Sequence, residues 1–129
     1  MNKEDFEEGF IELIKGAIDE KEKGRYRNAN VLYWKALMKL CDYIHWKDNG
    51  NMPENLARRL NHFKTRKNGE KVLRILGEKL EAGTPYNIYD STYIKKQDTE
   101  DCKVMENAIK DLVRLFSISG IIKKTTEEI

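Results

Sequence analysis

The sequence is poor in cysteine, proline and histidine, with two of each in 129 residues. Neither Cys41 nor Cys102 has a partner at C-x-x-C spacing, so we expect two reduced thiols in the core of a cytoplasmic protein. No apolar run approaches the roughly 18 residues that a membrane-spanning helix needs, and no membrane association is expected. The acidic N-terminal residues predict neither a signal peptide nor a transit peptide.

The small number of cysteines and histidines also limits the metal sites and catalytic sites that the chain can form. A zinc site needs three or four ligands at helix or hairpin spacing, and the two histidines and two cysteines do not supply it. Glycine-rich phosphate loops and the G-x-S-x-G motif are absent from the sequence. Cys41 and His45 stand four residues apart, but a core thiol and a helix-end histidine are the favoured interpretation. We therefore predict no metal and no cofactor.

What the chain does have is helical periodicity. Apolar residues recur at three- and four-residue steps over residues 3–23, 25–47, 70–81 and 99–119, and Pro53 marks the first position of a further helix. The pattern predicts an all-α fold, an up-and-down antiparallel bundle of four to five helices. Residues 1–120 form a single domain in this prediction, and residues 121–129 are a polar tail that frays.

The second predicted helix is apolar on most of its sides. A helix of this kind is buried against more than one neighbour. Trp34, Met38 and Trp46 extend its apolar surface beyond what four amphipathic neighbours need to cover, so we predict a subunit interface at these residues. Residues 86–97 contain three tyrosines without helical period, and we expect an ordered loop, with or without a short helical turn. Packing on the core is the favoured interpretation of this loop, and a functional role is the alternative.

Charge is distributed unevenly along the chain. Residues 56–79 carry eight basic and two acidic side chains, a net +6, whereas residues 1–24 carry four and eight, a net −4. Such polarity is compatible with a solvated surface, nucleic-acid binding or self-association. The predicted nucleic-acid-binding residues are Arg58, Arg59, Lys64, Arg66, Lys67, Lys71 and Arg74.

One pairing in this region has catalytic potential. Arg58 and Arg59 precede His62 by four and three positions, and helical phase places Arg58 on the same face as His62. A histidine base beside an arginine that binds phosphate is suitable chemistry for RNA cleavage. These three residues are the candidate catalytic groups.

Four elements of the chain form a recognisable pattern. They are the G-x-Y-x-x-A element at Gly24–Ala29, the Tyr-Trp-Lys-Ala-Leu run at 33–37, the aromatic segment at 86–89 and the last helix around 108–113. Together these elements resemble the HEPN superfamily, especially its small archaeal stand-alone members. The resemblance implies an all-α bundle and a homodimer. Some members are metal-independent RNases or toxins, and some partner a minimal nucleotidyltransferase.

Active HEPN members carry an arginine followed by a histidine after four to six intervening residues. Arg58 and Arg59 stand too close to His62 for that motif, so the RNase role does not carry over. The leading hypothesis is a non-enzymatic helical module that self-associates and binds a protein or RNA. A HEPN-type RNase or toxin component is one alternative. A TPR-like peptide-binding module is another, although no second repeat follows the first helix pair.

Overall fold

The computed structural model describes residues 2–116 and 118–129, which form seven α-helices and one 3₁₀ helix, with no strand among them. The all-α prediction is therefore confirmed. In chain order the elements are α1 (Lys3–Glu22), α2 (Tyr26–Asn49), α3 (Leu56–Thr65), α4 (Gly69–Leu76), α5 (Pro85–Asp90), η1 (Ser91–Tyr93), α6 (Thr99–Leu115) and α7 (Gly120–Thr126).

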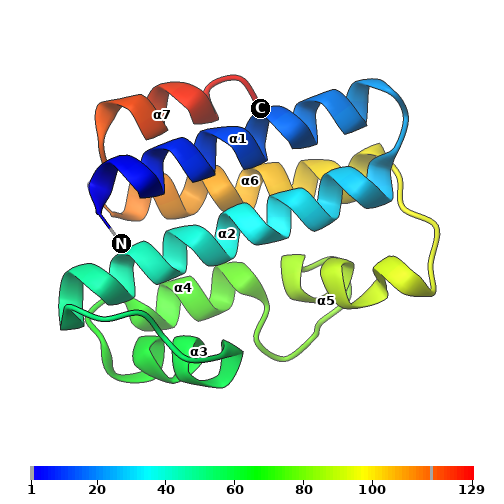
Figure 1. Cartoon of the computed structure of the whole chain (residues 1–129). Coiled ribbons are helices and arrows are strands. Elements are labelled where there is room, and N and C mark those ends of the chain that lie inside the picture. The colour runs from blue at the N-terminus through cyan, green and yellow to red at the C-terminus, as the bar shows by residue number, and fades with distance from the viewer. Residues whose placement is uncertain (1, 117) are drawn as a thin grey trace.

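Helices α1 and α2 form an antiparallel hairpin around which the other elements pack (Figure 1). Gly24 lies in the turn between them with φ of +77°, a conformation that disfavours residues with a Cβ. The aromatic ring of Phe6 stacks on that of Tyr43, with ring centroids 4.1 Å apart. The fully buried Phe10, Ile14 and Leu37 continue this interface, so the apolar stripes of both helices meet as the sequence predicts.

Helix α6 closes the core on the other side of the hairpin. Its N-terminus carries a capping box, in which Asp98 and Asp101 each accept a hydrogen bond from the backbone N–H of the other at 3.0 Å. Met105 and Ile109 are fully buried along the face of α6 that packs on α2. Cys41 and Cys102 are free and buried, as predicted. Burial raises the pKa of the Cys41 thiol to about 12.

The third and fourth helices differ in their bounds from the sequence prediction. Pro53 does not start α3, because Asn55 is the N-cap and its side chain accepts a hydrogen bond from the backbone N–H of Arg58. Helix α4 ends at Leu76 rather than at residue 81, because Gly77 adopts φ of +81°. A Cβ at Gly69 would lie 1.8 Å from the carbonyl oxygen of Phe63, so the α3–α4 turn requires glycine there.

The aromatic segment packs on the core as predicted, but it is helical. Residues 85–93 form α5 and η1 in place of the expected loop. The Trp34 ring stacks on Tyr89 with centroids 5.0 Å apart and meets Tyr86 edge-on at 5.5 Å. The indole therefore provides the apolar surface on which this short helix forms.

The predicted fraying tail is also helical. Helix α7 packs against α1 and α6, with Ile122 fully buried and Thr125 and Thr126 also buried. The sequence of α7 is mostly polar and shows no apolar helical period, because Ile122 is its one large buried apolar side chain. None of the helices in residues 2–116 and 118–129 combines the length and apolar character that crossing a membrane requires.

Candidate functional site

Two of the seven predicted nucleic-acid-binding residues are held by carboxylates of α2. Arg59 donates two hydrogen bonds to Asp42, at 2.5 Å from Nε and 3.2 Å from a terminal nitrogen. Arg66 makes a similar fork on Asp48, with a terminal nitrogen 3.1 Å from the carboxylate. Both arginines therefore fasten α3 to α2, and neither guanidinium is free for a phosphate.

The other five predicted basic residues lie on exposed surface. Lys64 lies 3.7 Å from Glu78, and Arg74 lies 3.1 Å from Glu70. The remaining three, Arg58, Lys67 and Lys71, have no ion-pair partner in the part of the chain that the structure describes. Their positive charge is therefore available to a ligand.

His62 is fixed on both of its ring nitrogens. The Asp48 carboxylate accepts a hydrogen bond from Nε2 at 2.7 Å, and Nδ1 accepts one from the side-chain amide of Asn49 at 3.4 Å. Desolvation acts to raise the pKa of Asp48, but its hydrogen bonds from Arg66 and His62 prevail and lower it. Asp48, His62 and Arg66 form what we call the Asp48 cluster.

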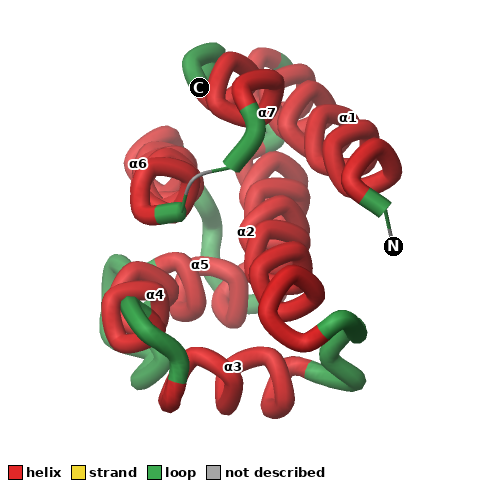
Figure 2. The backbone as a smooth tube through the Cα atoms, turned by 90° about the vertical axis from the view of Figure 1, so that its left-hand side faces the viewer, coloured by secondary structure: helices red, strands yellow, loops and turns green. Residues whose placement is uncertain are grey.

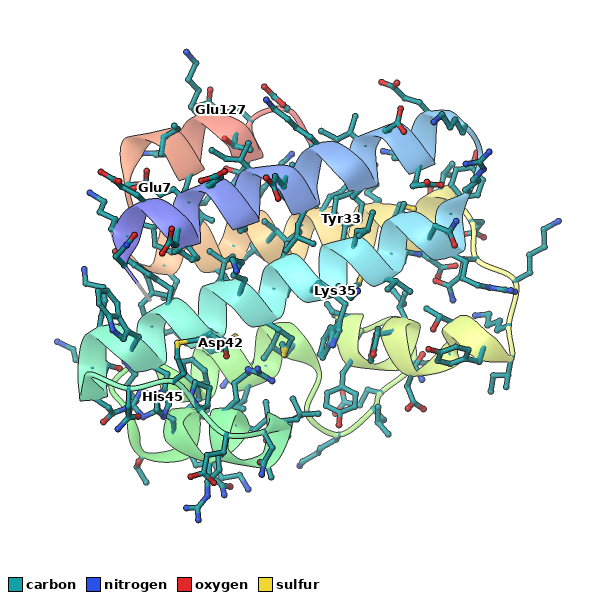
Figure 3. The ribbon with its side chains drawn as sticks, viewed as in Figure 1. Glu7, Tyr33, Lys35, Asp42, His45 and Glu127 are labelled. Carbon is teal, nitrogen blue, oxygen red and sulfur yellow. The ribbon has the colours of Figure 1, made fainter. Side chains whose placement is uncertain are left out.

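His45 lies beside this cluster with a different set of contacts. Its ring meets that of His62 edge-on, with centroids 4.8 Å apart. The carbonyl oxygen of Asn51 lies 2.8 Å from Nδ1 and can only accept, so Nδ1 carries the proton. In the neutral ring Nε2 then has a lone pair, and no group in residues 2–116 or 118–129 hydrogen-bonds to it. Figure 3 labels His45 on the side of α2 that faces α3.

His45 and Arg58 line one surface hollow. Its volume is about 450 Å³, and its wall is completed by Pro53, Glu54 and neighbouring residues of the α2–α3 connection. A proton acceptor and a guanidinium thus face the same space, although Glu54 reduces the positive potential. This arrangement can bind a phosphate ester and accept a proton from a hydroxyl beside it.

The structure therefore changes the pairing of the candidate catalytic residues. The sequence predicts His62 with Arg58 or Arg59, but His62 and Arg59 are both held by carboxylates. Sequence reasoning missed His45 as the partner of Arg58, because thirteen residues and a change of direction separate them. The available signal was a polar stripe on an otherwise apolar helix, at Asp42, His45 and Asp48.

A second polar group lies within the bundle, and the sequence analysis did not find it. Glu106 of α6, 6% exposed, accepts hydrogen bonds from the Tyr33 hydroxyl at 2.6 Å and from the Lys21 ammonium at 2.9 Å. Burial and the hydrogen bond to Glu106 raise the pKa of Tyr33 far above its ordinary value. These three residues, the Glu106 cluster, join α1, α2 and α6.

The predicted interface residues are largely covered by the chain itself. Trp34 is 5% exposed under α5, and Met38 is 8% exposed. Neither presents an apolar surface to a second subunit. Trp46 is half-buried against the core, with its ring 6.0 Å from that of Tyr43.

Comparison with known proteins adds no relative: the chain matches no family model, no curated protein and no solved structure. Among the residues that the structure describes, no three histidine, cysteine, aspartate or glutamate side chains converge in a way that would hold a metal ion.

Proposed function

We propose that this protein is a non-enzymatic helical module that binds nucleic acid through α3 and α4. The observation that carries the proposal is the exposure of Arg58, Lys67 and Lys71, whose charges no carboxylate of the described chain neutralises. Basic side chains of this kind displace the counterions condensed on a phosphate backbone, which drives binding without sequence preference.

The separation of charge across the molecule supports the same proposal. Segment 1–24, with its net −4, folds mainly as α1, and segment 56–79, with its net +6, as α3 and α4. Figures 1 and 2 both place α1 on one side of α2 and α3 on the other. A polyanion is therefore attracted to the α3–α4 end and repelled from α1.

A charge-matched pair of variants tests this proposal. The triple variant R58Q/K67Q/K71Q removes the three unpaired charges, and K15Q/K35Q/K95Q removes three exposed lysines elsewhere. Fluorescence anisotropy with a labelled RNA at several salt concentrations measures both affinity and its salt dependence. We expect the slope of log affinity against log salt to fall by about 2 in the first variant only. Equal slopes in both variants would show that the α3–α4 surface is merely solvated.

The proposal includes the HEPN-type homodimer that the sequence resemblance implies, with a minimal nucleotidyltransferase as the corresponding protein partner. Of the three predicted interface residues, Trp46 retains the exposure that a contact requires. Light scattering at tens of micromolar protein tests the dimer, and Trp46→Glu should shift it to monomer. A wild-type protein that is monomeric under these conditions contradicts this part of the proposal.

RNA cleavage is the second candidate function, and the free Nε2 of His45 is the observation that favours it. In this reaction Nε2 takes the proton of a ribose 2′-hydroxyl, whose oxygen attacks the adjacent phosphorus. The bond to the 5′-oxygen breaks, and that oxygen takes a proton from water. Arg58, in the same hollow, stabilises the charge on the phosphate.

Cleavage of RNA in EDTA distinguishes the two functions. If the protein is an RNase of this kind, His45→Ala should lower the rate by about 10²- to 10⁴-fold. His62→Ala should retain more activity, because His62 only supports the His45 ring. No cleavage by the wild type leaves the binding function alone, and equal activity in both variants excludes His45 as the base.

A further inference from the structure

A line of basic residues that the sequence does not reveal runs from α4 over α6 to α7. A hollow of about 430 Å³ separates α4 from α6 and is lined by Lys71, Arg74 and Arg114. A second hollow of about 350 Å³, between α6 and α7, is lined by Lys110, Lys123 and again Arg114. Arg114 thus lines both hollows, and Figure 2 shows α6 between α4 and α7, with α7 beside α1.

The charges along this line are open to a ligand. Five basic residues line the two hollows, against the two carboxylates of Asp111 and Glu127. Arg114 lies 3.3 Å from Asp111, but the two side chains are 70% and 51% exposed. Exposed pairs of this kind contribute little, so a phosphate can replace the carboxylate as the partner of Arg114. Arg74 is similarly exposed in its pair with Glu70.

The opposite flank of α4 has the reverse character. The hollow there is lined by Glu70, Glu78 and Glu81, with Arg74 and Lys79 as the basic residues. A phosphate backbone that reaches α4 is therefore favoured on the α6 side and disfavoured on the other.

The lining of the first hollow combines apolar and charged residues. We call its apolar residues, Ile75 and Leu115, the floor, and its basic residues, Lys71, Arg74 and Arg114, the rims. A duplex offers phosphates to such a groove but keeps its base faces stacked inside. A single strand offers phosphates to the rims and a base face to the floor, which is the combination found in single-strand-binding grooves.

We propose that α4, α6 and α7 form a track for single-stranded nucleic acid, with phosphates along Lys71, Arg74, Arg114, Lys110 and Lys123 and a base against Ile75 and Leu115. This inference rests on the proposed nucleic-acid-binding function and specifies its ligand. It also adds residues of α6 and α7 that lie outside the basic segment of the sequence.

The test uses the full chain with labelled 15-nucleotide single strands of RNA and of DNA and with a 15-base-pair duplex. The variant K110Q/R114Q/K123Q removes charge from α6 and α7 only, and K15Q/K35Q/K95Q is the charge-matched control. We expect the wild type to bind the single strands at least about 10-fold more tightly than the duplex. The α6–α7 variant should lose about 10-fold in single-strand affinity, with a salt slope smaller by about 2.

A second variant separates the apolar floor from the charges. Ile75→Thr should weaken single-strand binding about 3-fold and leave both the salt slope and duplex binding unchanged, because no charge is removed. Circular dichroism and thermal unfolding of each variant establish that it is folded.

Different outcomes test the single-strand track and the proposed binding through α3 and α4 separately. If R58Q/K67Q/K71Q loses affinity but K110Q/R114Q/K123Q behaves as the control, the track is wrong and the proposed function stands. Equal wild-type affinity for single strand and duplex also overturns the track. No binding of any nucleic acid at low salt overturns both. A preference between RNA and DNA strands identifies which of the two the track takes.

Discussion

The Glu106 cluster and the Asp48 cluster have similar chemistry in opposite surroundings. Each joins a carboxylate to a basic side chain and to a further hydrogen-bond donor. Glu106 is 6% exposed and lies between three long helices, whereas Asp48 is exposed at the end of α2. The first cluster holds the bundle together, and the second positions groups beside a surface hollow.

The difference lies in what each cluster leaves available. The Tyr33 hydroxyl and the Lys21 ammonium both donate to one oxygen of Glu106, so these donors are engaged within the cluster, although its three residues also line a hollow of about 340 Å³. Beside the Asp48 cluster, His45 and Arg58 line one hollow, and no described residue hydrogen-bonds to Nε2 of His45 or pairs with Arg58. Similar chemistry is therefore buried and paired in one place and lies beside unpaired groups in the other, and burial is the main difference between them.

The largest effect expected from this comparison is that of Glu106→Ala. The substitution leaves the buried Tyr33 hydroxyl without its acceptor and the Lys21 ammonium without its counter-ion. We expect the free energy of unfolding to fall by about 3 kcal/mol, measured by urea denaturation. Glu12→Ala, on the exposed face of α1, is the control and should change it by less than about 0.5 kcal/mol. Equal losses in the two variants would mean that the Glu106 cluster does not stabilise the bundle.

A smaller effect is expected for Asp48→Asn, about 1 kcal/mol at neutral pH, because the Asp48 side chain is 25% exposed against 8% for that of Glu106, and partly solvated pairs contribute less. The pKa of Asp48 is lower in the folded protein than its ordinary value of 3.8. Its contribution is therefore complete above that value and disappears as the pH falls through the folded pKa. The difference between wild type and variant should shrink on acidification, as urea titrations at pH 7 and pH 3 would show.

The matching control for this pH dependence is Asp90→Asn, an exposed aspartate without an ion pair in the described structure. Its stability relative to wild type should be nearly independent of pH. A difference for Asp48→Asn that grows towards pH 3 would contradict the assigned role of the carboxylate.

The smallest effect on stability is expected for His45→Ala. The ring is half-buried and loses one hydrogen bond to the carbonyl of Asn51, so the cost should be about 0.5 kcal/mol. The same variant should have the largest effect on any RNA cleavage. A loss of stability comparable to that of Glu106→Ala would mean that His45 mainly stabilises the fold.

Much of the fold follows from local sequence patterns. The stripes of α1, α2 and α6 have the 3.6-residue period, and Gly24 and Asp98 mark ends that the structure confirms. The sequence predicted at most a short helical turn where α5 lies, because this helix forms where Tyr86 and Tyr89 pack on Trp34. It did not predict α7 either, because Ile122 is the one buried apolar side chain of that helix, and the buried Thr125 and Thr126 are polar.

The candidate site was less accessible to sequence reasoning than the fold. The sequence identified Arg58, Arg59 and His62 as a group, but it does not show which of them are bound to a carboxylate of the fold. Asp42 lies seventeen residues before Arg59, and Asp48 lies fourteen before His62. Such partners are set by how α3 folds back on α2, and no local pattern records that geometry.

By itself, the sequence determined the helical class, the long helices and the charge difference between the two parts of the chain. These depend on composition and periodicity, which are local properties. Only the tertiary structure decided which charges are free, that His45 rather than His62 faces the hollow with Arg58, and that Arg114 lies across a groove from Lys71. Those features depend on contacts between distant segments, which packing of the apolar core brings together.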